Sequence, residues 1–206
     1  MDVLSDQFYS ERAKELKDRV SEKRLAHIEG VAKCAAMLAQ VYGIDERKAR
    51  LAGLLHDWDK GYRNNAMRER VCDLGLDSTL DPWVVANLPE VLHGPTAAAA
   101  LSRSFPEIPP DVIHAIEVHT VACKDMSDLD KIIYVADAIE PNRNYDGVDA
   151  IRAEVGKVQL DDLYRDVYKH WLSVLLEKEV VMHPDTIDIW NEMVYDGSRK
   201  KKKKFD

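Results

Sequence analysis

The chain has 206 residues, of which 46% are apolar and 32% charged, and its formal net charge is −8. This length allows one sizeable hydrophobic core, and the acidic balance argues against nonspecific binding of nucleic acid. No apolar run approaches the length of a membrane span, and the first ten residues lack the pattern of a secretory signal. The three cysteines are widely separated, with no CxxC pair, so we expect a cytoplasmic protein without a disulfide framework.

The first predicted helices carry clear boundary signals. Apolar residues recur at spacings of three and four, which is typical of helices. Ser21 is placed to cap a helix that ends near Gly43. Asp45 can cap a second helix that reaches about Trp58. The small residues on one face of this helix, Ala49, Ala52 and Gly53, would let a neighbouring helix approach His56.

The helical pattern continues to the end of the chain. The remaining predicted elements are short helices and loops over 62–92 and helices over 95–101, 110–119, 127–139, 160–175 and 184–194. Pro95 favours a helix start that leaves His93 just before it. Ser127 and Asp130 form an S-x-x-D capping box. Because alternating strand patterns are nearly absent, we predict an all-α helical bundle.

We predict a single domain over residues 1–198, with its core at 20–155 and C-terminal helices at 156–196. The run from Arg199 to Lys204 is basic, and residues 199–206 are predicted to be a disordered tail. The alternative for this tail is an electrostatic arm for RNA or a membrane surface. Exposed tryptophans on the terminal helices would permit a homodimer. Three tryptophans are interpreted as core or interface residues: Trp83, Trp171 and Trp190.

Six residues of metal-binding types lie in or beside apolar segments: His27, His56, Asp57, His93, His119 and Asp137. An unpaired polar group is costly in such surroundings, so a shared metal would account for all six. His56 and Asp57 are adjacent, and their side chains diverge by about 100° on a helix. A relaxed helix end would remove this difficulty, and a carboxylate there can bridge two ions. The other histidines are interpreted as surface or structural: His114, His170 and His183.

A nitrogen and oxygen ligand set suits iron, manganese, cobalt or zinc better than calcium. Two such ions held close together activate water and neutralise charge on a phosphoryl group during in-line displacement. Arg24, Lys60 and Arg143 would supply the cations that a polyphosphate needs in an acidic protein. Plainer interpretations exist for single residues, because Asp57 could pair with Lys60 and Asp137 with Arg143.

The ordered motifs resemble the HD-domain metal-dependent phosphohydrolases. The likeness is greatest to their YqeK-like branch, the symmetrical bis(5′-nucleosyl)-tetraphosphatases. It covers roughly residues 20–155 and is carried by RLAH at 24–27, LLHDWDK at 54–60, VLHGP at 91–95, AIEVHT at 115–120, MSDLDK at 126–131 and ADAIEPNR at 136–143. Asp59 departs from this likeness by adding a negative charge near the proposed site.

The resemblance implies an all-α HD fold with a two-iron centre that cleaves diadenosine tetraphosphate into two ADP. By position, one metal would be held by His27, His56, Asp57 and Asp137. Asp57 would bridge to a second metal, held by His93 and His119. The residues implied beside the substrate phosphates are Arg24, Lys60, Thr120 and Arg143. Asp57 and Lys60 would be catalytic, and manganese is the alternative metal.

Two other functions remain open at this point. One is a different HD phosphohydrolase that acts on dNTPs, cyclic nucleotides or other nucleoside phosphates. The other is a regulatory protein that binds metal or nucleotide without turnover. A substrate panel separates the first from the expected activity, and nucleotide binding without hydrolysis would favour the second.

Overall fold

The computed structural model describes residues 2–195, and no strand occurs among them, so the all-α prediction is confirmed. The elements are α1 (Asp6–Arg19), α2 (Glu22–Tyr42), α3 (Glu46–Leu55), α4 (Asn65–Asp73), α5 (Pro82–Asn87), the 3₁₀ turn η1 (Pro89–Val91), α6 (His93–Ser104), α7 (Pro110–Val118), α8 (Asp128–Ile139), α9 (Val148–Arg152), α10 (Leu160–Glu177) and α11 (Thr186–Val194). No helix within this range is long and apolar enough to cross a membrane. The basic run from Arg199 to Lys204 lies outside the described residues.

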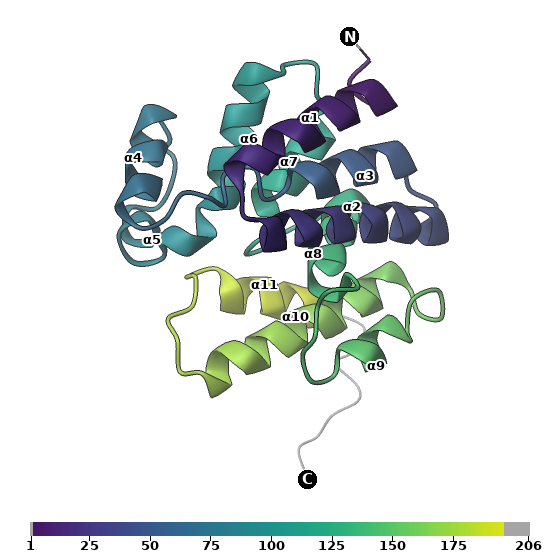
Figure 1. The fold of residues 1–206 in the computed structure, drawn as a ribbon. Helices are drawn as coiled ribbons and strands as arrows, with labels where there is room; N and C mark the ends of the chain where they lie inside the picture. The colour runs from purple at the N-terminus through teal and green to yellow at the C-terminus, as the bar shows by residue number, and fades with distance from the viewer. Residues whose placement is uncertain (1, 196–206) are drawn as a thin grey trace.

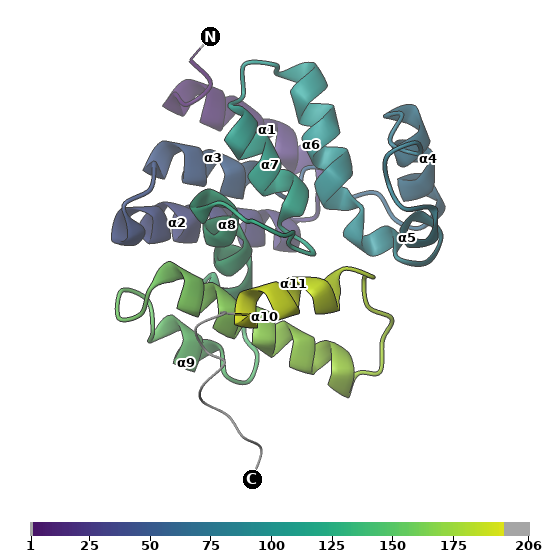
Figure 2. The same cartoon turned by 180° about the vertical axis from the view of Figure 1, so that it is seen from behind.

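Helix α8 lies at the centre of the bundle. It packs against α2, α3 and α7 on one side and against α10 on the other. Figure 1 shows α9, α10 and α11 as a layer apart from the larger group of α1, α2, α3, α6 and α7, and Figure 2 shows the same division from behind. Ile132, Ile133 and Val135 of α8 are completely buried. Burial on both sides accounts for the continuous apolar run in this segment.

The predicted boundary signals act as expected. The Ser21 side chain accepts a hydrogen bond from the Arg24 amide, and Gly43 ends α2 in the left-handed conformation with φ of 76°. Asp45 caps α3, and Ser127 forms a reciprocal capping box with Asp130 at the start of α8. These side chains satisfy amide groups that have no partner within their own helix.

Two helix boundaries near the site and one whole helix differ from the prediction. Helix α3 ends at Leu55, so the segment reaching Trp58 forms turns instead. Helix α6 already begins at His93, which puts Pro95 in its third position, where a proline is tolerated because the amide would have no helical partner. Helix α1 was not predicted, because its sequence is mostly charged and buries only Phe8 and Leu16.

The predicted short helices over 62–92 are present as α4, α5 and η1. They enclose a small apolar cluster beside the main core: Met67, Val71, Val84, Leu88 and Leu92. Trp83 of α5 is 46% exposed, so it does not belong to the core, and its interpretation as an interface residue stays a prediction. Trp171 and Trp190 do pack against the main core. In both views α4 and α5 lie at one side of the bundle.

Two glycines close in sequence to the predicted ligands His56 and His93 allow pairs of helices to approach closely. A Cβ atom on Gly53 of α3 would lie 2.8 Å from the Cα atom of Ala32 in α2. A Cβ atom on Gly94 of α6 would lie 2.5 Å from the carbonyl oxygen of Glu117 in α7. Both distances are too short for a side chain, so each helix pair depends on a missing methyl group. The expected role of small residues in this region is therefore confirmed for Gly53.

Candidate metal centre

The six predicted ligand residues come together from five helices. His27 lies in α2, and Asp137 is third from the end of α8. His56 and Asp57 follow α3, His93 is the first residue of α6 and His119 follows α7. Ligand atoms within 4.8 Å of one another form three groups: His27–His56–Asp57, His56–His119–Asp137 and Asp57–His93–His119. One compact cluster therefore contains all six side chains.

Three of the four histidine rings are oriented by backbone carbonyls. The Nδ1 atom of His56 lies 2.7 Å from the carbonyl oxygen of Gly53, three residues earlier. His93 and His119 repeat this arrangement with the carbonyls at the same offset, at 2.8 and 2.7 Å. Nδ1 must donate in these contacts, which leaves the Nε2 lone pair of each neutral ring directed away from the backbone. This is the usual arrangement of metal-binding histidines.

His27 is oriented by a side chain instead. Its Nδ1 lies 3.0 Å from Oε1 of Glu140, which is buried at the end of α8. The other Glu140 oxygen accepts hydrogen bonds from the Asn142 amide and side chain at 2.7 and 3.0 Å. Glu140 belongs to the ADAIEPNR motif at 136–143, but the sequence analysis predicted no role for it in the site. The signal that could have identified it is an acidic residue directly after an apolar helical run, where an unpaired carboxylate would be costly.

Asp57 presents each of its carboxylate oxygens to a different pair of histidines. Oδ2 lies 3.8 Å from Nε2 of His27 and 3.4 Å from Nε2 of His56. Oδ1 lies 3.2 Å from Nε2 of His93 and 3.9 Å from Nε2 of His119. The turn after α3 releases His56 and Asp57 from helical geometry, so the adjacent side chains can both face the cluster.

Arginine side chains contact both carboxylates of the cluster. Arg24 Nη1 lies 2.9 Å from Asp57 Oδ2, and Arg143 Nη2 lies 2.5 Å from Asp137 Oδ1. The plainer pairing of Asp137 with Arg143 is thus present, although Asp137 Oδ1 also lies 3.0 Å from His27 Nε2. The alternative pairing of Asp57 with Lys60 does not occur among the described ion pairs, because Lys60 Nζ lies 3.3 Å from the ring nitrogens of His93.

Burial and neighbouring charges set the protonation of the cluster. Burial lowers the pKa of His93 and lowers that of His119 to about 3. Burial would also lower the pKa of His56, but contact with Asp57 outweighs it and the pKa is raised. Burial opposes ionisation of both carboxylates, yet it is outweighed by His56 and His93 beside Asp57. His27 and Arg143 do the same beside Asp137, so both pKa values lie below the ordinary value. Ionised carboxylates and neutral imidazoles are the forms that bind metals, so His93 and His119 are in the binding form, whereas a metal would displace a proton from His56.

Two buried nitrogen atoms test whether the donor set fits a metal. Nε2 of His27 and Nε2 of His56 have no hydrogen-bond partner among the described residues. Asp137 Oδ1 lies 3.0 Å from His27 Nε2, but this nitrogen has no proton to donate in the neutral ring whose Nδ1 donates to Glu140. A buried polar atom without a partner is costly, and a cation between these nitrogens and the two carboxylates would satisfy all of them. The residues present therefore fit a divalent metal ion.

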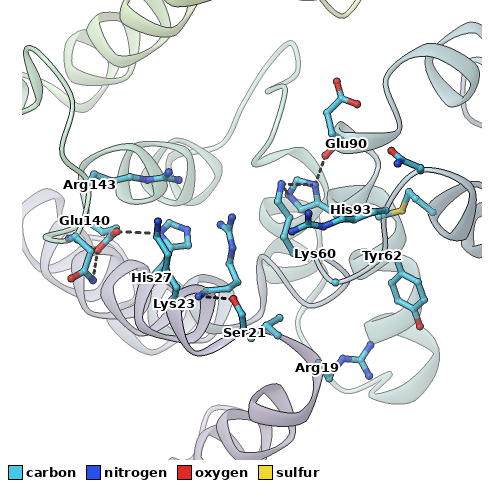
Figure 3. A pocket seen from close by; sticks show the side chains of 17 residues that line it. Arg19, Ser21, Lys23, His27, Lys60, Tyr62, Glu90, His93, Glu140 and Arg143 are labelled. Atoms are coloured by element: carbon cyan, nitrogen blue, oxygen red, sulfur yellow. Dashed lines mark hydrogen bonds and ion pairs between the residues drawn. The ribbon is translucent and has the colours of Figure 1, made fainter.

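Two cavities open onto the cluster. The first has a volume of about 860 Å³ and is lined by the cations Arg19, Lys23, Arg24, Lys60, Arg63 and Arg143. Figure 3 shows this cavity, with Arg143 over His27 and Lys60 beside His93. The second has a volume of about 760 Å³, shares Arg24, Lys60 and Arg143 with the first, and contains Thr120. All four residues predicted beside the substrate phosphates thus line a cavity at the cluster.

The charge of Asp59 is paired with two arginines. Its carboxylate is completely buried and lies 3.1 Å from Arg19 Nη2 and 2.9 Å from Arg70 Nε. The two guanidinium groups balance its charge, so Asp59 adds no uncompensated negative charge near the site. Asp59 instead joins α1 and α4 to the turn that carries Asp57.

The three remaining histidines lie outside the cluster. His114 is 47% exposed at its side chain and pairs with Asp130 at 3.0 Å. His170 stacks on Tyr145 with ring centroids 4.5 Å apart. His183 lines the second cavity. The surface or structural interpretation therefore holds for His114 and His170, while His183 also borders the site.

Comparisons with known proteins agree with this arrangement. The HD domain family matches residues 24–142. Curated proteins named symmetrical bis(5′-nucleosyl)-tetraphosphatase are 34% identical in Staphylococcus aureus (93% of this chain, 97% of that protein) and 32% identical in Halalkalibacterium halodurans (87% and 93%). A crystal structure from Clostridium acetobutylicum, described as a predicted HD superfamily hydrolase involved in NAD metabolism, has a TM-score of 0.81 and 31% identity over 90% of this chain and 96% of that one. The chain belongs to the HD-domain family of metal-dependent hydrolases and, within it, to the symmetrical bis(5′-nucleosyl)-tetraphosphatases.

Proposed function

We propose that this protein hydrolyses diadenosine tetraphosphate to two ADP at a centre of two divalent metal ions. The observation that carries the proposal is the position of Asp57, whose two oxygens face separate pairs of histidine Nε2 atoms. The residues proposed to hold one ion are His27, His56, Asp57 and Asp137, and those proposed to hold the other are Asp57, His93 and His119. The names of the curated relatives support the choice of substrate.

The bound ions would act as Lewis acids that activate water and reduce the charge on the phosphoryl group under attack. The protein's own cations complete the site. Arg24 and Arg143 already lie at the two carboxylates and can turn to the equatorial phosphate oxygens, which guanidinium groups bind well. Lys60 and Thr120 both lie 3.3 Å from His93 Nε2, where they can donate to the bridging or leaving phosphate oxygen.

We propose iron as the resident metal, with manganese as the alternative. Nitrogen and oxygen donors accept several first-row metals, so the ligand types restrict the metal without selecting one. Elemental analysis of protein purified without chelators measures the metal identity and the number of atoms per chain. About two iron atoms per chain is the expected result. A cytoplasmic location and a homodimer remain predictions from the sequence.

The activity is tested with purified protein, Fe²⁺ or Mn²⁺, and diadenosine tetraphosphate, followed by chromatography of the nucleotides. Wild-type protein should release ADP as the single nucleotide product, whereas His56→Ala and Asp57→Ala should not. ADP formation no greater than in these two variants would refute the proposal. Release of AMP with ATP, or hydrolysis of dNTPs in preference to the dinucleotide, would instead assign a different HD phosphohydrolase activity.

A further inference from the structure

The second half of α10 lines the second cavity with apolar side chains. Along its first half, the same face is buried in the core and contains Leu160, Leu163, Tyr164, Val167 and Tyr168. Trp171, Leu172 and Leu175 continue this face at helical spacing and line the second cavity, and Trp171 also packs against the edge of the main core. Figures 1 and 2 show α10 and α11 together in the layer that lies opposite the group of helices that carries the histidines. The apolar face thus becomes a wall of the site.

The loop after α10 extends this wall. Val180, Val181 and Met182 line the same cavity, and the two valines are 46% and 59% exposed. An apolar surface that opens into a cavity next to cations is typical of a site for a ligand with an apolar part and a charged part. A nucleotide has both parts, because its base is a flat apolar ring system and its phosphates are anionic.

The side chain of Trp171 is held in place before any ligand binds. Its ring centroid lies 5.4 Å from that of Tyr145 and 5.3 Å from that of His170. These contacts restrict the indole without removing it from the cavity. Aromatic side chains held in this way bind nucleobases by stacking, with little dependence on which base is present.

The first cavity is different in character. Its six cations include three that the second cavity lacks, Arg19, Lys23 and Arg63. Among the described residues that line the first cavity, Tyr62 is the single member of the Phe, Tyr and Trp class. The guanidinium group of Arg70 lies over the Tyr62 ring, 5.1 Å from its centroid. One side of the centre is therefore suited to a nucleoside, and the other to phosphates.

We propose that the site holds the two halves of its substrate unequally. One nucleoside would bind against Trp171, and the other half would be held through its phosphates in the cationic cavity. This inference rests on the proposed function, and it extends the substrates to nucleoside 5′-tetraphosphates that lack the second nucleoside. Adenosine 5′-tetraphosphate should be cleaved to ADP and pyrophosphate.

The extended reaction uses the same bonds as the proposed one. The oxygen of one water molecule bonds to one of the two central phosphorus atoms. The bond from that phosphorus to the bridging oxygen breaks, and the electron pair leaves with the other diphosphate. The water gives up one proton, which passes to the leaving diphosphate or to solvent. One tetraphosphate and one water thus give two diphosphates, with no oxidant or further reactant.

The first test compares two substrates of the wild-type protein. The ratio kcat/KM for adenosine 5′-tetraphosphate should be within about tenfold of that for diadenosine tetraphosphate, because the second nucleoside contributes little binding. Inorganic tetraphosphate should be a far poorer substrate, because it lacks the part that contacts Trp171.

The second test measures binding of ADP and of pyrophosphate by calorimetry, with the metal that supports hydrolysis. Trp171→Ala should weaken ADP binding about tenfold to hundredfold, which is the usual effect of losing a stacked base, and leave pyrophosphate binding unchanged. Trp171→Phe should restore most of the affinity for ADP. Trp83→Ala is the matched control, since Trp83 is exposed and lines neither cavity.

The outcomes separate this inference from the proposed function. If the wild type cleaves neither tetraphosphate, the proposed function fails. If it cleaves diadenosine tetraphosphate but leaves adenosine 5′-tetraphosphate intact, the unequal binding alone is refuted. If Trp171→Ala weakens ADP and pyrophosphate equally, or weakens neither, the placement of the base against Trp171 is wrong.

Discussion

Replacing Glu140 by glutamine changes the hydrogen bond that orients His27, while the side chain at position 140 keeps almost the same volume. Glu140 is 1% exposed, and each of its two carboxylate oxygens accepts from a different residue. Oε1 lies 3.0 Å from His27 Nδ1, and Oε2 accepts two hydrogen bonds from Asn142. A carboxylate can accept from all three donors at once, whereas an amide accepts only on its oxygen side. Glu140→Gln therefore forces a mismatch on one side or the other.

Each orientation of the new amide has its own cost. If its oxygen faces His27, its NH₂ group opposes the two N–H donors of Asn142, and a buried donor without an acceptor costs about 1–3 kcal/mol. If its NH₂ group faces His27, Nδ1 becomes the acceptor and the proton moves to Nε2. The lone pair that would bind metal is then lost, and changes of this kind reduce metal affinity about tenfold to hundredfold.

The assay therefore measures both the metal affinity and the free energy of unfolding of the Glu140→Gln variant. Calorimetric titration with Mn²⁺ measures the metal affinity, and urea unfolding measures the free energy of unfolding. Glu107→Gln is the matched control, because Glu107 is exposed in the loop between α6 and α7. Glu140→Gln should lose affinity, stability or both relative to this control. Equality of the two variants in both measurements would refute the argument that Glu140 orients His27.

Three further substitutions test the centre and its surroundings. Asp57→Asn removes the charge between the two pairs of histidines, so hydrolysis should fall by more than about hundredfold, with loss of bound metal by elemental analysis. Gly94→Ala places a methyl group 2.5 Å from the Glu117 carbonyl, so urea unfolding should show a loss of about 1–3 kcal/mol. Asp59→Asn deprives two arginines of their shared carboxylate and should cost about 1–3 kcal/mol of stability. Its metal content should stay unchanged, and a loss of metal would contradict the assignment of Asp59 to support of the fold.

Local signals predict the fold better than they predict the site. Caps such as Ser21 and Asp45 are readable because the side chain and the amide it serves are neighbours in the chain. The convergence of His27 and Asp137, which are 110 positions apart, depends on the packing of α2 against α8, and no periodicity encodes that contact. Residue types indicated a metal, whereas the expected grouping of the ligands came from a family resemblance.

The sequence could not predict, for a related reason, that the second half of α10 lines a cavity. Its apolar face continues without interruption from Val167 to Leu175, so the pattern predicts burial along the whole length. Which half meets the core and which half meets a cavity depends on the helices opposite. A hydrophobic pattern reports that a surface avoids water, and it does not distinguish a protein partner from a ligand.

The positions of the histidines follow from a rule about free carbonyl groups. Inside a helix each backbone carbonyl already accepts a hydrogen bond from an amide, so it is a poorer acceptor for a histidine ring than the free carbonyls at a helix end. His56, His93 and His119 lie at helix boundaries and bond to carbonyls three residues back. His27 lies within α2, where such carbonyls are occupied, and it needs an acceptor from elsewhere. Glu140 is that acceptor, so the one histidine inside a helix is accompanied by a buried acidic residue at the end of another helix.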